Sequence, residues 1–243
     1  MSHTPDPVIT LFNYGGGLRG LIPAQIMAHI EQDTGLRMAD MVDVFAGPST
    51  GAILNAAMTL RNPESHNTPK YRARHLVRFY EREGERIFPP DRFRDLRGLI
   101  HDFNNRTMRI SQLNNILDHG HYNPHNLGRA LKALYGEAKL NDSLKSLIIP
   151  AYNIDGEQLR VLSETGELGQ SIHSYGNYMD TAGHALWMKN IKINGALGDR
   201  HKTIDVTLYD AVMASTAAPT YFPCHHFMAR WPGNAHQHHY TAI

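Results

Sequence analysis

The chain opens with an apolar segment that runs directly into a cluster of glycines and then into a second apolar segment, VITLFNYGGGLRGLIPAQI (residues 8–26). Residues 8–12 form a short apolar segment with β-branched side chains, which predicts a buried strand. Residues 20–35 have the composition and end signals of a helix. Glycine is unfavourable inside regular structure, so the cluster at 15–17 indicates a turn in which the backbone closely approaches a ligand or another segment.

Strands and helices alternate along the rest of the chain. Further strands are predicted at 41–47, 146–154 and 158–164, and further helices at 49–60, 71–86, 123–136 and 207–218. Residues 61–70 are predicted to form a loop, and Asp155-Gly156 a turn between two adjoining strands. This alternation predicts an α/β fold, a three-layer sandwich around a mostly parallel central sheet. No linker or internal repeat divides the chain, so we expect a single domain over residues 1–243.

The first predicted helix has an apolar side as well as clear ends. Pro23 falls in its first turn, and Gly35 is predicted to end it. The apolar residues along one side of this helix are Leu21, Ile22, Ile26, Met27 and Ile30.

Composition excludes several classes of protein. With 24 Lys and Arg against 23 Asp and Glu, the net charge is +1, so nothing favours a nucleic-acid partner. The single cysteine cannot form a disulfide within the chain. No apolar stretch reaches the ~18 residues that a spanning helix needs, and the N-terminus does not resemble a secretory signal. We expect a cytoplasmic or peripheral membrane protein, with secretion by a route without a signal peptide left open.

The glycine cluster admits a nucleotide-binding interpretation. GGGLRG (residues 15–20) fits G-x-G-x-x-G between a predicted strand and a predicted helix. A dinucleotide site also needs an acidic residue near the end of the second strand. The second strand instead ends in FAGPSTG, with Asp43 four residues before Gly47. The motif alone is therefore weak support for a nucleotide.

A second motif favours acyl transfer. GPSTG (residues 47–51) is a G-x-S-x-G at a predicted strand-to-helix turn, where a serine hydroxyl is lifted clear of the sheet. The simpler interpretation is that Ser49 only caps the following helix. Neighbouring parallel strands would bring both motifs to the same edge of the sheet. The glycine loop could then donate backbone N–H groups to the oxyanion that forms when Ser49 attacks an ester.

Together with ASTAAPTYFPCHHF (residues 214–227), these motifs resemble the patatin-like phospholipases in order and spacing, and the resemblance covers nearly the whole chain. It implies a patatin-like fold and hydrolysis of acyl esters of phospholipids or other lipids. Ser49 would be the nucleophile, and Gly16, Gly17 and Arg19 would belong to the oxyanion loop. The remaining motif positions are Gly15, Gly20, Gly47 and Gly51. No cofactor or metal is implied.

Three positions depart from the family pattern. Tyr14 stands where an aspartate usually precedes the glycines, and Pro48 replaces a small residue before the nucleophile. The family uses a Ser–Asp pair in which the carboxylate is the general base. Its Asp-Gly-Gly or Asp-Gly-Ala is expected just after HHYTAI, which ends this sequence at Ile243. We therefore expect the C-terminal part of the domain to be missing and the catalytic aspartate to lie beyond this chain's end.

Other residues offer alternatives for the base. Asp155, Asp205 and Asp210 are weaker candidates, expected to serve as turn or capping residues. One of the clustered histidines could act as a base for Ser49, and Cys224 with His225 or His226 could bind zinc, but a lone cysteine makes a weak zinc site. We expect these histidines to be solvated or to pack against their neighbours.

The expected partners follow from the resemblance. They are a phospholipid or other lipid ester and, through peripheral contact, a membrane, with nucleic acid excluded and any protein partner undefined. Arg19 and the basic residues of 71–78 could meet lipid headgroups, although 71–78 is more simply the solvated side of a helix. The alternative function is a lipid-binding or regulatory module that has lost hydrolysis.

Overall fold

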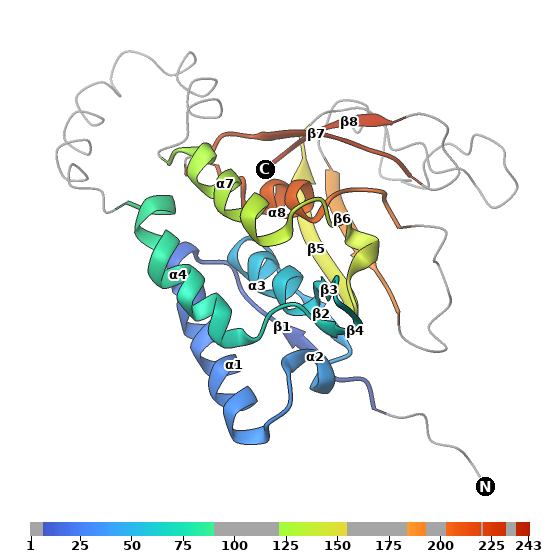
Figure 1. The fold of residues 1–243 in the computed structure, drawn as a ribbon. Helices are drawn as coiled ribbons and strands as arrows, with labels where there is room; N and C mark the ends of the chain where they lie inside the picture. The colour runs from blue at the N-terminus through green and yellow to red at the C-terminus, as the bar shows by residue number, and fades with distance from the viewer. Residues whose placement is uncertain (1–6, 90–121, 155–183, 193–202, 220, 232–236) are drawn as a thin grey trace, which may run out of the picture.

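A computed structural model describes residues 7–89, 122–154, 184–192, 203–219, 221–231 and 237–243 (Figure 1). Six strands form one sheet in the order β1-β2-β5-β8-β7, and β6 also pairs with β5. Their bounds are β1 Thr10–Phe12, β2 Val44–Ala46, β5 Ser146–Asn153, β6 His184–Asn190, β7 His225–Ala229 and β8 His238–Ala242. Strands β1, β2 and β5 are parallel, while β6 and β8 run antiparallel to β5, and β7 to β8.

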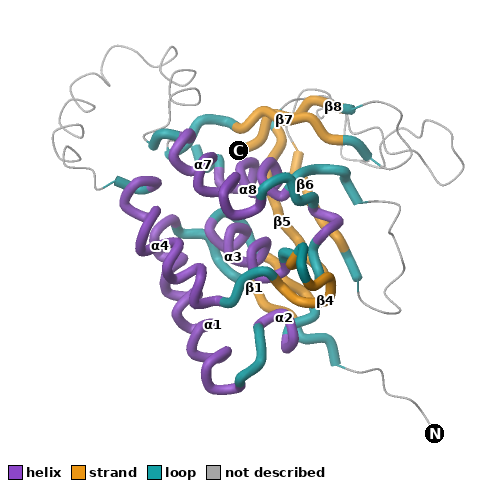
Figure 2. Tube along the Cα trace, in the orientation of Figure 1, coloured by secondary structure: helices purple, strands orange, loops and turns teal. Residues whose placement is uncertain are grey.

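Helices connect the parallel strands and cover the sheet (Figure 2). Their bounds are α1 Leu21–Thr34, α2 Met38–Met41, α3 Thr50–Thr59, α4 Ala73–Ile87, α7 Pro124–Tyr135 and α8 Leu208–Thr216, with short 3-10 helices η1 Gly17–Gly20 and η2 Leu140–Asp142. Helices α3 and α8 contact each other and β5, while α4 and α7 pack on α3. The α/β sandwich predicted from the sequence is confirmed. None of the described helices is both long and apolar enough to cross a bilayer.

Helix α3 is the centre of the core. All ten of its residues are buried, because the sheet lies on one side and other helices surround the rest. Small side chains such as Ala52, Ala56 and Ala57 permit this close approach. Phe45 on β2 and Leu147 on β5 pair in register, and both side chains are fully buried. This packing holds both ends of α3 firmly, including the end that follows Ser49.

The buried side of α1 differs from the side that the sequence suggested. Ile22 and Ile26 are 61% and 56% exposed, and the residues that pack inward are Ala24, Met27 and Glu31. The Glu31 carboxylate accepts hydrogen bonds from the backbone N–H groups of Met38 and Ala73, both at 2.9 Å. Those residues begin α2 and α4, so one buried acid satisfies two helix N-termini. These long-range bonds determine the orientation of the helix.

The ends of α1, the segment 61–70 and the neighbours of β5 were also predicted from the sequence. The predicted ends of α1 are confirmed, since Gly35 adopts a left-handed φ of 72° at the C-cap. The loop at 61–70 is wrong, because β3 (Arg61–Asn62) and β4 (Ser65–Pro69) form an antiparallel hairpin there. The strand predicted at 158–164 and the Asp155-Gly156 turn lie outside the described residues, and the observed antiparallel neighbours of β5 are β6 and β8.

The histidine-rich segments form the β7–β8 hairpin. His226 shares a hydrogen bond of 3.0 Å with the Thr241 hydroxyl and stacks on His239. On the other side of the hairpin, the rings of Phe227 and Tyr240 stack at 5.3 Å and are buried. The expectation that these histidines pack against neighbours is confirmed for His226.

Asp205 joins distant parts of the chain through ion pairs. Its carboxylate lies 2.8 Å from Lys139 Nζ and 3.2 Å from an Arg230 guanidinium nitrogen. These partners, the Lys139 hydrogen bond foremost, lower the pKa of the Asp205 carboxyl from its usual value. A lowered folded-state pKa stabilises the protein above the unfolded pKa, about 3.9, and this contribution is lost as the pH falls through the folded pKa.

We therefore expect Asp205→Asn to lower the free energy of unfolding at pH 7 by several tenths to about 1 kcal/mol, because the pairs are partly exposed. The difference from the parent should shrink as the pH falls below about 4, where the parent's carboxyl becomes protonated. Urea denaturation at several pH values measures it. Asp33→Asn, at an exposed position of α1, is the control. A cost independent of pH would contradict the ion-pair account.

Candidate functional site

Ser49 lies in a strained turn between β2 and α3. Strand β2 ends at Ala46 and α3 begins at Thr50, with Ser49 at the N-cap. Its φ of 53° and ψ of −124° make it the one non-glycine residue with positive φ in the described part of the chain. Such a conformation costs on the order of 1–3 kcal/mol, so the surrounding structure must hold it. The serine is half-buried, as expected for a nucleophile that a substrate must reach.

The end of β1 crosses directly over this turn. A Cβ added to Gly47 would lie 1.9 Å from the Asn13 carbonyl oxygen, and one added to Gly51 would lie 2.0 Å from it. The two glycines of G-x-S-x-G are therefore required by the backbone of Asn13. The Asn13 N–H donates to the Ala46 carbonyl at 2.9 Å. Its buried side-chain amide donates to Asn55 Oδ1 at 2.7 Å, which ties β1 to α3.

Ser215 holds the turn from the other side. Its hydroxyl oxygen accepts a hydrogen bond from the Ser49 backbone N–H at 3.0 Å. The same hydroxyl donates to the carbonyl of Pro150 in β5. The strained residue is thus connected to α8 and to the central strand.

The glycine loop lies against Ser49, as the parallel pairing of β1 with β2 predicted. A Cβ on Gly15 would lie 3.1 Å from the Ser49 Cβ and 3.7 Å from its Oγ. Gly16 and Gly17 adopt positive φ values of 157° and 57°, which turn the chain into η1. Thr50, next to the serine, donates its hydroxyl to the Gly17 carbonyl at 2.9 Å. The two motifs therefore form one unit.

Three backbone N–H groups in the glycine loop and at the start of α3 have no acceptor among the described residues. They belong to Gly16, Gly17 and Thr50. The last is at the N-terminus of α3, where the helix dipole favours negative charge. Donors of this kind can stabilise an oxyanion that develops beside Ser49.

Arg19 is exposed, and its backbone closes the loop. Its N–H donates to the Gly16 carbonyl at 3.1 Å. Its side-chain carbons lie over Gly16, with Cβ 3.4 Å from the position that a Gly16 Cβ would occupy. At the fourth motif glycine, Gly20, a Cβ would meet the Thr50 methyl at 1.9 Å. Tyr14 is 79% exposed and packs edge-on against Phe12.

The alternative acids and histidines are engaged elsewhere. Asp205 forms the ion pairs described above. The Asp210 N–H donates to the Thr207 hydroxyl that caps α8, and its carboxylate lies 3.0 Å from His225 Nε2. Asp155 lies outside the described residues. Within the described ranges, no carboxylate or imidazole forms a hydrogen bond with the Ser49 hydroxyl.

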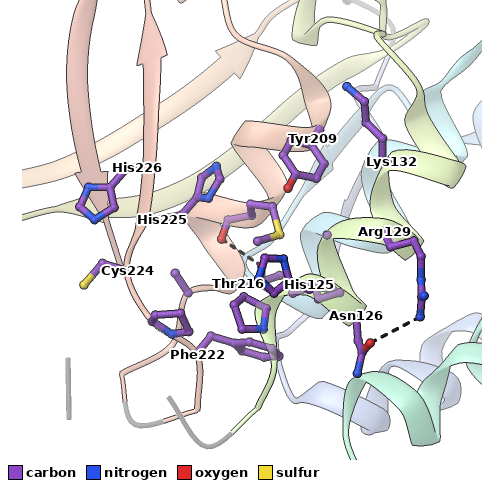
Figure 3. Close-up of a pocket in the computed structure, with 16 residues that line it drawn as sticks. His125, Asn126, Arg129, Lys132, Tyr209, Thr216, Phe222, Cys224, His225 and His226 are labelled. Carbon is purple, nitrogen blue, oxygen red and sulfur yellow. Dashed lines mark hydrogen bonds between the residues drawn. The ribbon is translucent and has the colours of Figure 1, made fainter. Parts of the chain in front are cut away.

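A cavity of about 840 Å³ lies between α7, α8 and the start of β7 (Figure 3). Phe222 lies toward one end of it, and Tyr209 and Lys132 toward the other. His225, His226 and Cys224 line it, but Ser49 does not. In the part of the chain that the structure covers, no three His, Cys, Asp or Glu side chains are placed to hold a metal ion.

Sequence reasoning missed three residues of the site. Ser215 belongs to the quoted segment 214–227 and Asn13 precedes the glycine loop, but neither was assigned a role, because only the folded sheet brings them to the serine. Thr50 could have been noticed as the hydroxyl residue directly after the proposed nucleophile.

Comparisons with known proteins show the family to which the chain belongs. A family model described as patatin-like phospholipase matches residues 14–236. The chain is 30% identical over 219 residues to Patatin-like protein 2 of Arabidopsis thaliana, an alignment that covers 88% of this chain and 43% of that protein. It is 27% identical to Patatin-like protein 2 of Oryza sativa subsp. indica, in an alignment that covers 93% of this chain and 47% of that protein. It is 25% identical to Probable inactive patatin-3-Kuras 1 of Solanum tuberosum, in an alignment that covers 88% of this chain and 44% of that protein. The chain thus spans less than half the length of these relatives, and it belongs to the patatin-like phospholipase family.

Proposed function

We propose that this protein is a lipid acyl hydrolase of the phospholipase A type, with Ser49 as the nucleophile. The observation that carries the proposal is the strained Ser49 turn packed against the glycine loop, with unpaired backbone donors in that loop and at the start of α3. An ester carbonyl bound beside Gly15 would lie within reach of the Ser49 hydroxyl. The N–H groups of Gly16, Gly17 and Thr50 support the negative charge that develops on the carbonyl oxygen.

The proposed reaction has two steps. The Ser49 oxygen bonds to the carbonyl carbon as its proton passes to a general base, and the ester C–O bond breaks while the leaving alcohol receives that proton. Water then attacks the carbonyl carbon of the acyl-serine and gives up a proton to the base. The bond between that carbon and the Ser49 oxygen breaks, the base returns the proton to the Ser49 oxygen, and the fatty acid is released. Calcium has no step in this sequence.

The proposed base is an aspartate, as the family resemblance implies. No described carboxylate forms a hydrogen bond with the Ser49 hydroxyl, which supports assigning the base to a residue outside the described ranges. Arg19, exposed beside the loop, would meet a phosphate group of the lipid, and the exposed Arg74 and Arg78 on α4 suit peripheral contact with anionic lipid.

Covalent labelling tests whether Ser49 is an activated nucleophile. A fluorophosphonate should add one phosphonyl group to the chain, and peptide mass spectrometry should locate it on Ser49. Unfolding the protein before labelling should prevent the addition, since the turn and its donors would be lost. Addition at another serine, with Ser49 unmodified, would contradict the assigned role.

A second candidate is a lipid-binding or regulatory module of the same fold. It is favoured by the lack of a described base at Ser49 and agrees with the word inactive in the name of the potato relative. The module predicts that the protein co-floats with phospholipid vesicles, that no fatty acid is released, and that fluorophosphonate does not react. Labelling at Ser49 would argue against it.

A further inference from the structure

Four aromatic rings from three distant parts of the chain meet in one cluster. Phe88 follows α4, Tyr122 precedes α7, and Tyr221 and Phe222 follow α8. The Phe88 ring centroid lies 5.7 Å from that of Tyr122 and 6.0 Å from that of Phe222. The Tyr122 and Phe222 centroids are 5.5 Å apart. We name Phe88, Tyr122 and Phe222 the aromatic wall, which Tyr221 extends by stacking on Tyr122.

The aromatic wall contacts the glycine loop and is connected to the end of α8. A Cβ on Gly17 would be 3.5 Å from the Phe88 ring, so this ring lies against the glycine loop. The Phe222 N–H donates to the Ala218 carbonyl at 3.0 Å, in the turn directly after α8. Ser215, near the end of α8, accepts the Ser49 N–H. The wall is therefore connected to both elements that position the serine.

The wall offers apolar surface that a ligand can reach. Phe88 and Tyr122 are half-buried, whereas Phe222 is only 5% exposed and packs against both of them. None of the three carries a charge, and their mutual contacts hold the rings in tilted and edge-on arrangements. An alkyl chain lying on these rings would remove apolar area from water on both partners.

The wall continues into the cavity of Figure 3, because Phe222 contributes to both. Other apolar residues that line this cavity include Leu127, Met213 and Ala217. A volume of about 840 Å³ is within the range of ~300–1,000 Å³ typical of small-molecule sites. The cavity that shares Phe222 with the wall therefore offers space for the far end of a long chain.

We propose that the aromatic wall binds the acyl chain of the lipid ester and makes the site prefer long chains over short ones. This inference rests on the proposed acyl hydrolase function, since it places the ester carbonyl at Ser49. Each methylene group buried on the wall should improve binding by roughly threefold to fourfold. A short acyl group would not reach beyond Phe88 and would gain little.

The test compares two esters and one fatty acid. Hydrolysis of p-nitrophenyl butyrate and p-nitrophenyl dodecanoate gives kcat/KM for a short and a long chain. Fluorescence of cis-parinaric acid, an 18-carbon fatty acid, measures chain binding without any reaction. For Phe88→Ala we expect the dodecanoate-to-butyrate ratio of kcat/KM to fall about tenfold or more, and the Kd of parinarate to rise by a similar factor.

Two further variants guard the interpretation. Tyr122→Leu keeps apolar bulk at a half-buried position and should change both quantities in the same direction, by roughly threefold. Trp187→Ala removes an exposed aromatic ring from β6 and should change neither. Circular dichroism checks that each variant is folded. If Phe88→Ala does not fold, Tyr122→Leu alone decides.

The outcomes separate this inference from the function on which it rests. If neither ester is hydrolysed but parinarate binds and the wall variants weaken it, the hydrolase proposal fails and the acyl-binding wall is supported. If both esters are hydrolysed and the wall variants lower both equally, with parinarate binding unchanged, the inference is overturned and the hydrolase stands. Absence of parinarate binding in the parent chain also overturns the inference.

Discussion

Replacing Ser49 by alanine is expected to lower fatty-acid release from mixed phospholipid vesicles by about 1,000-fold or more. The reason is that the first bond made to the substrate carbon in the proposed reaction comes from the Ser49 oxygen, and the attack of water follows only on the acyl-serine. The backbone donors of Gly16, Gly17 and Thr50 would remain, and donors without a nucleophile retain only residual acceleration. Release of free fatty acid, followed by chromatography of the lipid extract, measures the effect.

Ser65→Ala is the matched control for this substitution. Ser65 is an exposed serine on β4, so the change should leave the rate within twofold of the parent. Release that falls less than tenfold in Ser49→Ala would refute Ser49 as the nucleophile. If the parent chain itself releases nothing while binding vesicles, the lipid-binding module becomes the better account of these residues.

Gly51→Ala should destabilise the fold by about 3 kcal/mol or more, or prevent folding altogether. The added methyl group would lie 2.0 Å from the Asn13 carbonyl oxygen. That oxygen belongs to backbone anchored by the bonds of Asn13 to Ala46 and Asn55, so it cannot move away cheaply. In an ordinary helix interior the same change stabilises by ~1 kcal/mol, so the expected sign is reversed. Urea denaturation followed by circular dichroism measures it.

Gly84→Ala isolates the cause of this effect. Gly84 is also a buried helical glycine, in α4, but its added methyl would meet only a terminal methyl of Leu18, at 2.8 Å. A flexible side chain can rotate away, so we expect a change within about 1 kcal/mol of zero. Equal destabilisation by Gly51→Ala and Gly84→Ala would show that the Asn13 crossing is not the reason for the motif glycine.

Local signals in the sequence predicted much of the architecture. The glycines and apolar runs that bound β1, α1, β2 and α3 act over a few residues, so their elements could be identified without the fold. The Asn123 cap of α7 and the Thr207 cap of α8 also act locally, because their side chains accept backbone N–H groups two or three residues later. The hairpin at 61–70 was missed because its residues, including the turn residues Pro63 and Glu64, give no strong strand signal.

By itself, the sequence determined that this is an α/β protein of the patatin-like phospholipase family, with a glycine loop and a serine turn after two successive strands. Only the tertiary structure decided what surrounds that serine. Asn13 and Ser215 reach its turn, and the aromatic wall reaches the glycine loop, through contacts between residues far apart in the chain, which no local pattern encodes. The buried Glu31 is a second example of such long-range contacts. Its two bonds to the starts of other helices determine which side of α1 faces inward, against the preference of its isoleucines.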